Sequence, residues 1–157
     1  LTAVVASAVI GLFDATLERL VALAVLMPIV ASMGGNAGTQ TVTVAVRALA
    51  LRQIDRDAAA SFVRRELAVA VLNGVVFAAL AASISFLWFR DMDIAAVMAV
   101  AMFANLVVAG LSGTLVPLGL VRVGVDPAVA SSVFITTITD VVGFFVFLGL
   151  AALYLIQ

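Results

Sequence analysis

Long apolar runs alternate with short polar clusters along the whole chain. Each run is a candidate membrane-spanning helix, because a helix needs about 20 apolar residues to cross the hydrocarbon core of a bilayer. We expect a bundle of five transmembrane helices, the first of them truncated at its start because its run is only about half a span long. The five runs are Leu1–Phe13, Leu20–Leu49, Leu67–Phe89, Ile94–Leu120 and the stretch from Asp126 to Ile156.

Composition supports the membrane interpretation. Hydrophobic residues make up 66% of the 157 residues and charged residues 11%, and the mean hydropathy is +1.33. A soluble domain of this composition would leave a large apolar surface in water. We therefore expect an all-α membrane protein in which residues 1–157 form one transmembrane domain. Because the chain contains no cysteine and no histidine, disulfides, thiolate metal sites and histidine-based catalysis are excluded.

The arginines are distributed unevenly between the connections, and lysine is absent. The positive-inside rule places the arginine-rich connections in the cytoplasm, which puts the N-terminus inside and the C-terminus outside the plasma membrane. Acidic residues are interleaved with these arginines and no aromatic platform accompanies them, so we expect no nucleic-acid binding. The arginine-rich side holds Arg47, Arg52, Arg56, Arg64, Arg65 and Arg122, whereas the other side holds Arg19 and Arg90.

One carboxylate, Asp140, lies deep in an apolar run. Burying it costs about 2.5–3.5 kcal/mol on insertion scales, and no cationic side chain lies at matching depth in another run. We therefore expect it to bind a cation from solution. A protonated Asp140, hydrogen-bonded to a neighbouring helix, is the alternative. Helical spacing predicts that one face carries Ser132, Thr136, Thr139, Asp140 and Gly143.

The second run carries a complementary stripe of polar and small residues. Its glycines between positions 34 and 38 are expected to weaken the helix and to let carbonyl oxygens turn away from the helical hydrogen bonds. Such backbone is tolerated at membrane depth only inside protein or beside a wet cavity. Glycine-mediated helix contact is the alternative, and Asn73, Ser112 and the Ala109–Gly113 pair are expected to serve packing. The stripe consists of Ser32, Gly35, Asn36, Thr39, Gln40 and Thr43.

All of these candidate ligands are oxygen atoms, a set that suits Mg²⁺, Ca²⁺ or Mn²⁺. One carboxylate per chain falls short of a full coordination shell. Magnesium keeps several of its waters in many sites, so a sparse, hydroxyl-lined site fits a largely hydrated magnesium ion. A two-fold homodimer would bring two Asp140 side chains to one axis and nearly neutralise a divalent ion.

Several motifs resemble, in the same order, those of the MgtE-type magnesium transporters. They are Pro28, then Gly34-Gly35-Asn36-Ala37-Gly38-Thr39-Gln40, then Arg47-Ala48-Leu49-Ala50, Arg65-Glu66-Leu67, Gly124-Val125-Asp126-Pro127-Ala128 and Phe134-Ile135-Thr136-Thr137-Ile138-Thr139-Asp140. The resemblance implies a five-helix homodimer with a pore at the subunit interface, lined by the second and fifth helices. It also implies that Asp140 is the pore aspartate and that Thr136 offers a backbone carbonyl one turn earlier. From the second helix, the residues implied to face the ion are Gly35, Thr39 and Thr43, with Asn36 in the same motif.

The resemblance also implies features that these residues do not contain. Bacterial members of the family carry a cytosolic N-terminal domain and paired CBS domains that sense magnesium, and neither is found between residues 1 and 157. Three interpretations stay open: a magnesium channel or transporter, a broader divalent-cation or sodium-coupled transporter, and a non-conducting assembly subunit whose motifs serve packing. An enzyme is not expected, since an aspartyl protease needs two carboxylates at one site and only Asp140 lies deep in a run.

Overall fold

The fold is entirely helical in the described part of the chain. The structure is a computed structural model that describes residues 2–54 and 58–155. Two short helices come first and four long helices follow. The helices are α1 (Thr2–Gly11), α2 (Asp14–Arg19), α3 (Val21–Ala50), α4 (Ala58–Phe89), α5 (Met92–Arg122) and α6 (Pro127–Tyr154).

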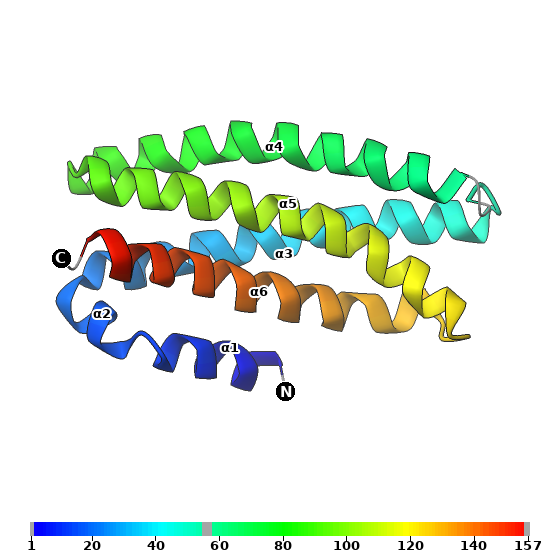
Figure 1. The fold of residues 1–157 in the computed structure, drawn as a ribbon, viewed down its shortest axis with the longest axis horizontal. Coiled ribbons are helices and arrows are strands. Elements are labelled where there is room, and N and C mark those ends of the chain that lie inside the picture. The colour runs from blue at the N-terminus through cyan, green and yellow to red at the C-terminus, as the bar shows by residue number, and fades with distance from the viewer. Residues whose placement is uncertain (1, 55–57, 156–157) are drawn as a thin grey trace.

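The four long helices run side by side, and successive ones point in opposite directions (Figure 1). Helix α5 is central, since it packs against α3, α4 and α6, whereas α1 lies along α6. Two connections, α3–α4 and α5–α6, lie at one end of the bundle. We call this the arginine-rich end, because Arg47, Arg52, Arg64, Arg65 and Arg122 lie there.

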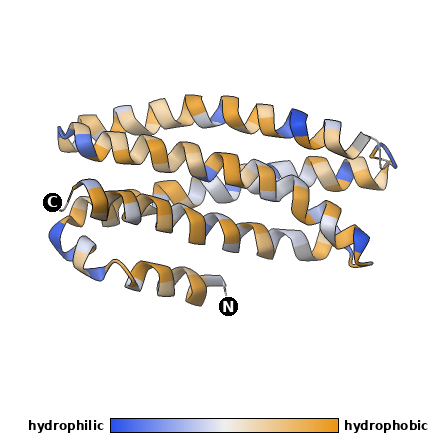
Figure 2. Ribbon diagram, viewed as in Figure 1, coloured by the Kyte–Doolittle hydropathy of each residue, from blue (hydrophilic) through white to orange (hydrophobic). Residues whose placement is uncertain are grey.

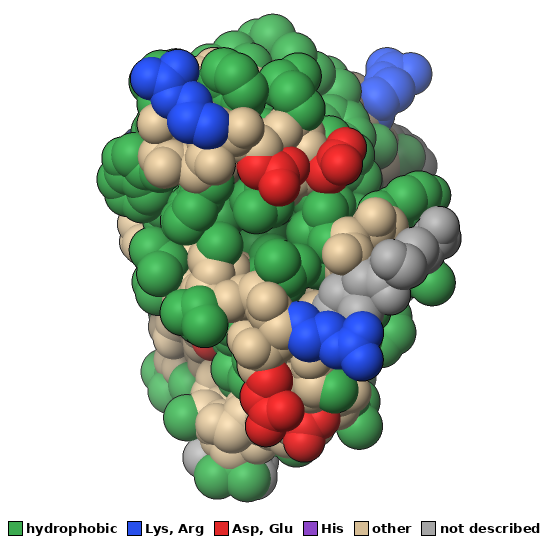
Figure 3. Space-filling view, turned by 90° about the vertical axis from the view of Figure 1, so that its left-hand side faces the viewer, with side chains coloured by type: hydrophobic (Ala, Val, Ile, Leu, Met, Phe, Trp, Pro, Cys, Tyr) green, Lys and Arg blue, Asp and Glu red, His purple; other side chains and the backbone are tan. Residues whose placement is uncertain are grey.

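The opposite end is formed by α2 and the α4–α5 turn, and Figure 3 looks onto it. Acidic side chains gather there in two places beside basic ones. We call it the acidic end, after Asp14, Glu18, Asp91 and Asp93. The two ends therefore differ in the sign of their charge, as the distribution of arginine predicts.

Four of the described helices, α3 to α6, are long and apolar enough to cross a membrane. Apolar residues cover most of their length (Figure 2), and many large apolar side chains of α4 are exposed, as a lipid-facing helix requires. The predicted all-α fold is thereby confirmed for the described residues, with four helices that are candidate membrane spans. Helix α1 is 10 residues long, so a fifth span stays a prediction.

Aspartate caps fix where two of the spans begin. The Asp126 carboxylate accepts a hydrogen bond from the amide of Ala128 at 2.9 Å, and Pro127 is the first helical residue. This confirms the predicted start of the last helix. At the acidic end, the Asp91 carboxylate accepts hydrogen bonds from the amides of Asp93 and Ile94 at 2.8 and 3.1 Å. That cap lets α5 begin three residues after α4 ends.

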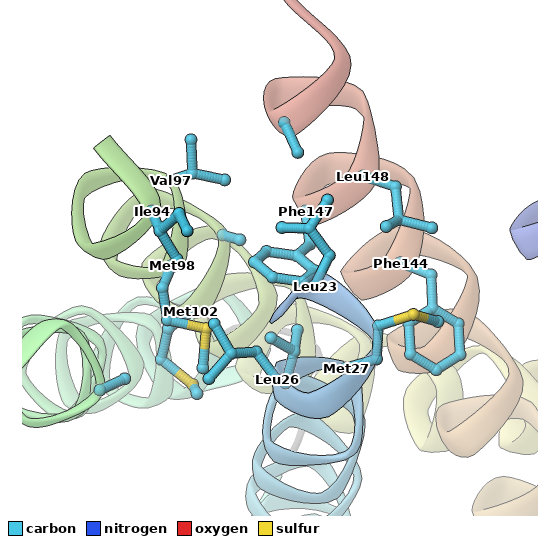
Figure 4. Close-up of a cluster of buried hydrophobic side chains, with 14 of the residues drawn as sticks. Leu23, Leu26, Met27, Ile94, Val97, Met98, Met102, Phe144, Phe147 and Leu148 are labelled. Carbon is cyan, nitrogen blue, oxygen red and sulfur yellow. The ribbon is translucent and has the colours of Figure 1, made fainter. Parts of the chain in front are cut away.

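A cluster of buried hydrophobic side chains forms the core (Figure 4). Its members on α3, α5 and α6 belong to the halves of these helices nearer the acidic end. Leu23, Leu26 and Met27 of α3 pack there against α5 and α6. Leu23, Leu26, Met98 and Phe147 are completely buried. Beyond this core, the middle of α3 carries polar residues on one exposed face, while Val42, Ala45 and Ala48 remain buried on the other.

Helix α3 continues without a break through Pro28 and through residues 34–38. The expectation that the glycines there would interrupt the helical hydrogen bonds is therefore wrong. Two of them instead allow close helix packing, because a Cβ atom on Gly34 would overlap the Asn105 amide and one on Gly38 would overlap Ile135. The alternative, glycine-mediated helix contact, holds for this pair. Gly35 differs, since the space beside it is open.

Candidate ion-binding site

An exposed polar stripe runs along the middle of α3. Asn36, Thr39 and Thr43 are exposed and Gly35 is half-buried, and all four lie on one side of the helix, at positions i, i+1, i+4 and i+8. Ser32 continues the stripe toward the acidic end. This is the face that the sequence predicts to be polar, and none of it is covered by another described helix.

Helix α6 presents a second polar face at its centre. Ser132 is exposed, and Thr136 and Asp140 are half-buried one and two turns later. The Asp140 carboxylate has no hydrogen-bond or ion-pair partner among residues 2–54 and 58–155, where the one ion pair joins Arg65 to Glu66. An unpaired carboxylate within an apolar span is costly, so this face is a candidate ligand site.

Contacts through α5 show that the two faces lie at the same depth. The Asn105 side chain lies between Gly34 of α3 and Gly143 of α6, since a Cβ on Gly143 would come 2.7 Å from its Nδ2. One level further along, Gly38 packs against Ile135. Helices α3 and α6 are antiparallel, so Asp140, between Ile135 and Gly143 in sequence, falls beside the Gly34–Gly38 segment.

Asn105 itself is the residue that the sequence analysis missed. Its side chain is completely buried, its Nδ2 donates to the Val30 carbonyl at 2.9 Å, and its Oδ1 has no partner among the described residues. Its position in the sequence could have indicated this role, because it is an amide in the middle of an otherwise apolar run. Polar side chains in membrane-spanning helices commonly form hydrogen bonds to neighbouring helices.

The threonine hydroxyls on the two faces donate to carbonyls of their own helices. Thr39 donates to Gly35 at 2.8 Å, Thr43 to Thr39 at 2.9 Å and Thr136 to Ser132 at 3.0 Å. A hydroxyl has one hydrogen and two lone pairs. With the hydrogen engaged, each oxygen is left to accept hydrogen bonds, and the waters around a cation are donors.

Thr139 does not share the exposed face of Thr136 and Asp140. It is completely buried, and its hydroxyl donates to the Ile135 carbonyl at 3.0 Å and to that of Thr136 at 3.2 Å. Gly143 is also buried, against Asn105. The sequence grouped both with Ser132 and Asp140, but packing on α3 and α5 turns them into the bundle. The Thr136 carbonyl, which the resemblance implies as an ion ligand, thus already accepts a hydrogen bond from Thr139.

The packing predictions for α5 are confirmed. A Cβ on Gly113 would lie 2.9 Å from the Gly38 carbonyl, and Ser112 is buried with its hydroxyl bonded to Val108. For Asn73 the packing prediction is wrong, because its side chain is exposed. Asn73 lines a cleft between α3 and α4, together with Gln40, which thereby departs from the α3 stripe.

A cation at this site would have few protein ligands from one chain. No group of three or more acidic side chains that could hold a metal ion occurs within the described ranges. Asp140 supplies one carboxylate, and the surrounding hydroxyls supply acceptor oxygens. Such an arrangement suits a hard cation that keeps much of its water.

Comparison with known families agrees with this chemistry. Residues 27–150 match the MgtE family, described as a divalent cation transporter. The chain belongs to the MgtE family. This confirms the resemblance seen in the sequence, and the matched range includes the α3 stripe, Asn105 and Asp140.

Individual MgtE relatives match nearly the whole chain. The magnesium transporter MgtE of Thermus thermophilus is 35% identical over 156 residues, which is 99% of this chain and 34% of that protein. The magnesium transporter MgtE of Bacillus subtilis is 32% identical over 151 residues, 96% of this chain and 34% of the relative. The chain thus spans about a third of the length of these MgtE proteins.

Proposed function

We propose that this chain moves magnesium ions across a membrane through a pore in which Asp140 binds the ion. The observation that carries the proposal is the Asp140 carboxylate, which has no partner within the described ranges and lies at the centre of an apolar span, beside the hydroxyl-bearing stripe of α3. Membership of a divalent-cation transporter family supports it, as do relatives named magnesium transporters. The 157 residues form the ion-conducting domain.

The pore lies at the interface of a homodimer. The polar stripe of α3 and the Ser132–Asp140 face of α6 are uncovered in a single chain, and lipid tails offer no hydrogen-bond partners. A second copy related by two-fold symmetry would enclose both faces around a wet axis and bring two carboxylates to it. This arrangement removes the polar faces from lipid and doubles the ligand set.

The ion passes largely hydrated. Thr39, Thr43 and Thr136 present acceptor oxygens whose hydrogens are engaged elsewhere, and the waters of a hydrated cation donate to such oxygens. Gly35 leaves open space beside them, and Asn36 adds an exposed amide. Mg²⁺ releases water reluctantly, so this lining favours it over Ca²⁺ and Mn²⁺, which share the oxygen preference.

The membrane is the plasma membrane, with the arginine-rich end in the cytoplasm, the N-terminus inside and the C-terminus outside. Arg47, Arg64 and Arg122 lie at that end, without acidic partners among residues 2–54 and 58–155, and the positive-inside rule favours such an end on the cytoplasmic face. An inside-negative potential of 100 mV favours entry of a divalent ion by about 4.6 kcal/mol, twice the value for one charge. Transport is therefore downhill and inward.

Ion flux in proteoliposomes tests the proposal. We expect the reconstituted chain to admit magnesium under an inside-negative potential, to admit calcium more slowly, and to need no sodium gradient. Equal calcium flux would favour a broader divalent transporter, and dependence on sodium would favour a coupled one. Absence of flux from a correctly folded dimer would favour a non-conducting assembly subunit and contradict the proposal.

A further inference from the structure

Helices α3 and α4 leave a cleft between them on the side away from α6. Helix α4 packs chiefly on α5 and scarcely on α3, so the cleft is floored by Leu106 and Gly110 of α5. Its volume is about 180 Å³. The cleft lies within two predicted spans, so a lipid can reach it from the bilayer.

Polar side chains line this cleft although it lies inside the spans. Gln40 of α3 and Asn73 of α4 are both exposed, and neither amide has a hydrogen-bond partner among the described residues. Lipid tails cannot satisfy amides. An occupant of the cleft must therefore carry hydrogen-bonding groups at this depth, next to the apolar wall formed by Val69 and Ala70.

Two arginines stand at the mouth of the cleft. Arg47 of α3 and Arg65 of α4 line a second, mainly polar cavity that shares Val44 with the cleft. The cavity lies where α3 ends and α4 begins, at the boundary of the spans. Arg65 lies 5.6 Å from the Phe62 ring centre, which helps to hold its guanidinium at this place.

We propose that the cleft binds one anionic phospholipid. The Arg47 and Arg65 guanidiniums bind its phosphate, since guanidinium matches phosphate oxygens in geometry and charge. The Gln40 and Asn73 amides donate to its ester carbonyls. Asn73 follows Arg65 by eight residues along α4, about 12 Å between their Cα atoms at 1.5 Å per residue, and the arginine side chain, the phosphate and the glycerol esters together span this distance. The acyl chains continue over the exposed apolar surface of α4, which includes Leu72 and Val76.

The cleft offers arginines at its mouth, amides deeper inside and an apolar wall beside them. A phospholipid matches all three, whereas a free anion or a peptide does not. A free phosphate would use only the two arginines and would leave the amides and the apolar walls uncovered. An apolar peptide segment from a second copy would cover the walls but would leave Arg47, which has no ion-pair partner among the described residues, without an anion. Basic pockets between helices at the membrane boundary commonly hold anionic headgroups.

The Glu66 carboxylate makes it possible to test for stronger as well as weaker lipid binding. Its carboxylate lines the cleft and is paired with Arg65 at 3.3 Å, with only 11% of the Glu66 side chain exposed. It therefore competes with the lipid phosphate for the Arg65 guanidinium. Removing its charge in Glu66→Gln should strengthen lipid binding, whereas removing either arginine should weaken it.

The experiment measures retention of lipid by the purified protein. Delipidated protein is titrated with phosphatidylglycerol or phosphatidylcholine in detergent, and bound lipid per chain is counted by native mass spectrometry. The variants are Arg47→Gln, Arg65→Gln and Glu66→Gln. The matched control is Arg64→Gln, which removes the same charge from the neighbouring residue, exposed and outside the cavity lining. Helix content by circular dichroism verifies that each variant is folded.

We expect one phosphatidylglycerol per chain to bind preferentially, with affinity about fivefold lower in Arg47→Gln and Arg65→Gln, in line with the effect of one interfacial cation. Glu66→Gln should bind more tightly and Arg64→Gln as the wild type. If one arginine variant misfolds, the other and Glu66→Gln still decide. Equal losses in Arg64→Gln, equal binding of phosphatidylcholine, displacement by inorganic phosphate alone, or cross-linking of a second copy into the cleft would each overturn the proposal. None of these outcomes bears on magnesium flux.

Discussion

The Asn105 amide donates a hydrogen bond to the Val30 carbonyl at 2.9 Å, across 75 residues of sequence. The bond joins the centre of α5 to α3, and Gly34 and Gly143 close on the same amide from α3 and α6. The helices cannot slide along one another without breaking this contact. Asn105 therefore sets the depth of Asp140 relative to the polar stripe of α3.

Replacing Asn105 by leucine should destabilise the fold. Asn105→Leu removes the donor and places a branched side chain against two glycines, with an expected loss of about 1–3 kcal/mol in the free energy of unfolding. Unfolding in detergent, followed by circular dichroism, measures it. Asn73→Leu is the matched control, because Asn73 is exposed and has no hydrogen-bond partner in the described part of the chain, and its effect should stay within about 0.5 kcal/mol. Equal stability of the two variants would show that Asn105 does not join the helices.

A double-mutant cycle tests the contact between Gly34 and Asn105. Gly34→Ala alone should cost about 1–3 kcal/mol, because its Cβ would overlap the Asn105 amide. Asn105→Ala opens that space, so the double variant should recover part of the loss, with a coupling of about 0.5–3 kcal/mol. Gly119→Ala, where the space is open, should not destabilise. Additive effects of Gly34→Ala and Asn105→Ala would contradict the geometry.

The hydroxyl of Thr39 should matter for transport and not for folding. Thr39→Val keeps the shape of the side chain but removes an acceptor from the proposed pore, and loss of one hydrogen bond predicts about a three- to tenfold fall in magnesium flux. Ser83→Ala is the control, since Ser83 is exposed on α4 and donates to its own helix at 2.7 Å. Magnesium flux is measured in proteoliposomes. Equal flux through the two variants would contradict the proposal that Thr39 lines the pore.

Cross-linking through introduced cysteines tests the homodimer. The chain has no cysteine of its own, so a single replacement reports one position. Ser132→Cys, on the exposed face of α6, should be linked to its copy by a short bifunctional thiol reagent in native membranes. Ser83→Cys on the lipid-facing side of α4 should not. The reverse pattern would place the subunit interface on α4 and the Ser132 face in lipid.

Much of the fold follows from the sequence because run length and helix caps are local signals. The third apolar run ends at Phe89, as helix α4 does, and the Asp126-Pro127 pair begins α6 as predicted. The polar faces around Thr39 and Asp140 also follow from helical spacing alone. Helical spacing does not predict which residues at the edges of a polar face are buried against neighbouring helices.

Thr139 and Gly143 illustrate that limit of helical spacing. Both are within one turn of Asp140, yet α3 and α5 cover them while Asp140 stays half-buried. The glycines of α3 show the same dependence on tertiary contact. Their composition suggested a broken helix, but Asn105 and Ile135 occupy the space beside Gly34 and Gly38, so the missing side chains serve packing. Asn105 was overlooked because a single amide has no periodicity.

Magnesium flux through Asp140→Asn proteoliposomes tests the central claim most directly. The substitution keeps the size of the side chain and removes its charge, and Glu18→Gln on the exposed surface of α2 removes one charge outside the spans. We predict that Asp140→Asn folds and dimerises but carries magnesium at the rate of empty liposomes, while Glu18→Gln carries it as the wild type does. Magnesium flux in Asp140→Asn equal to that of the wild type would contradict the proposal that Asp140 binds the ion in a pore.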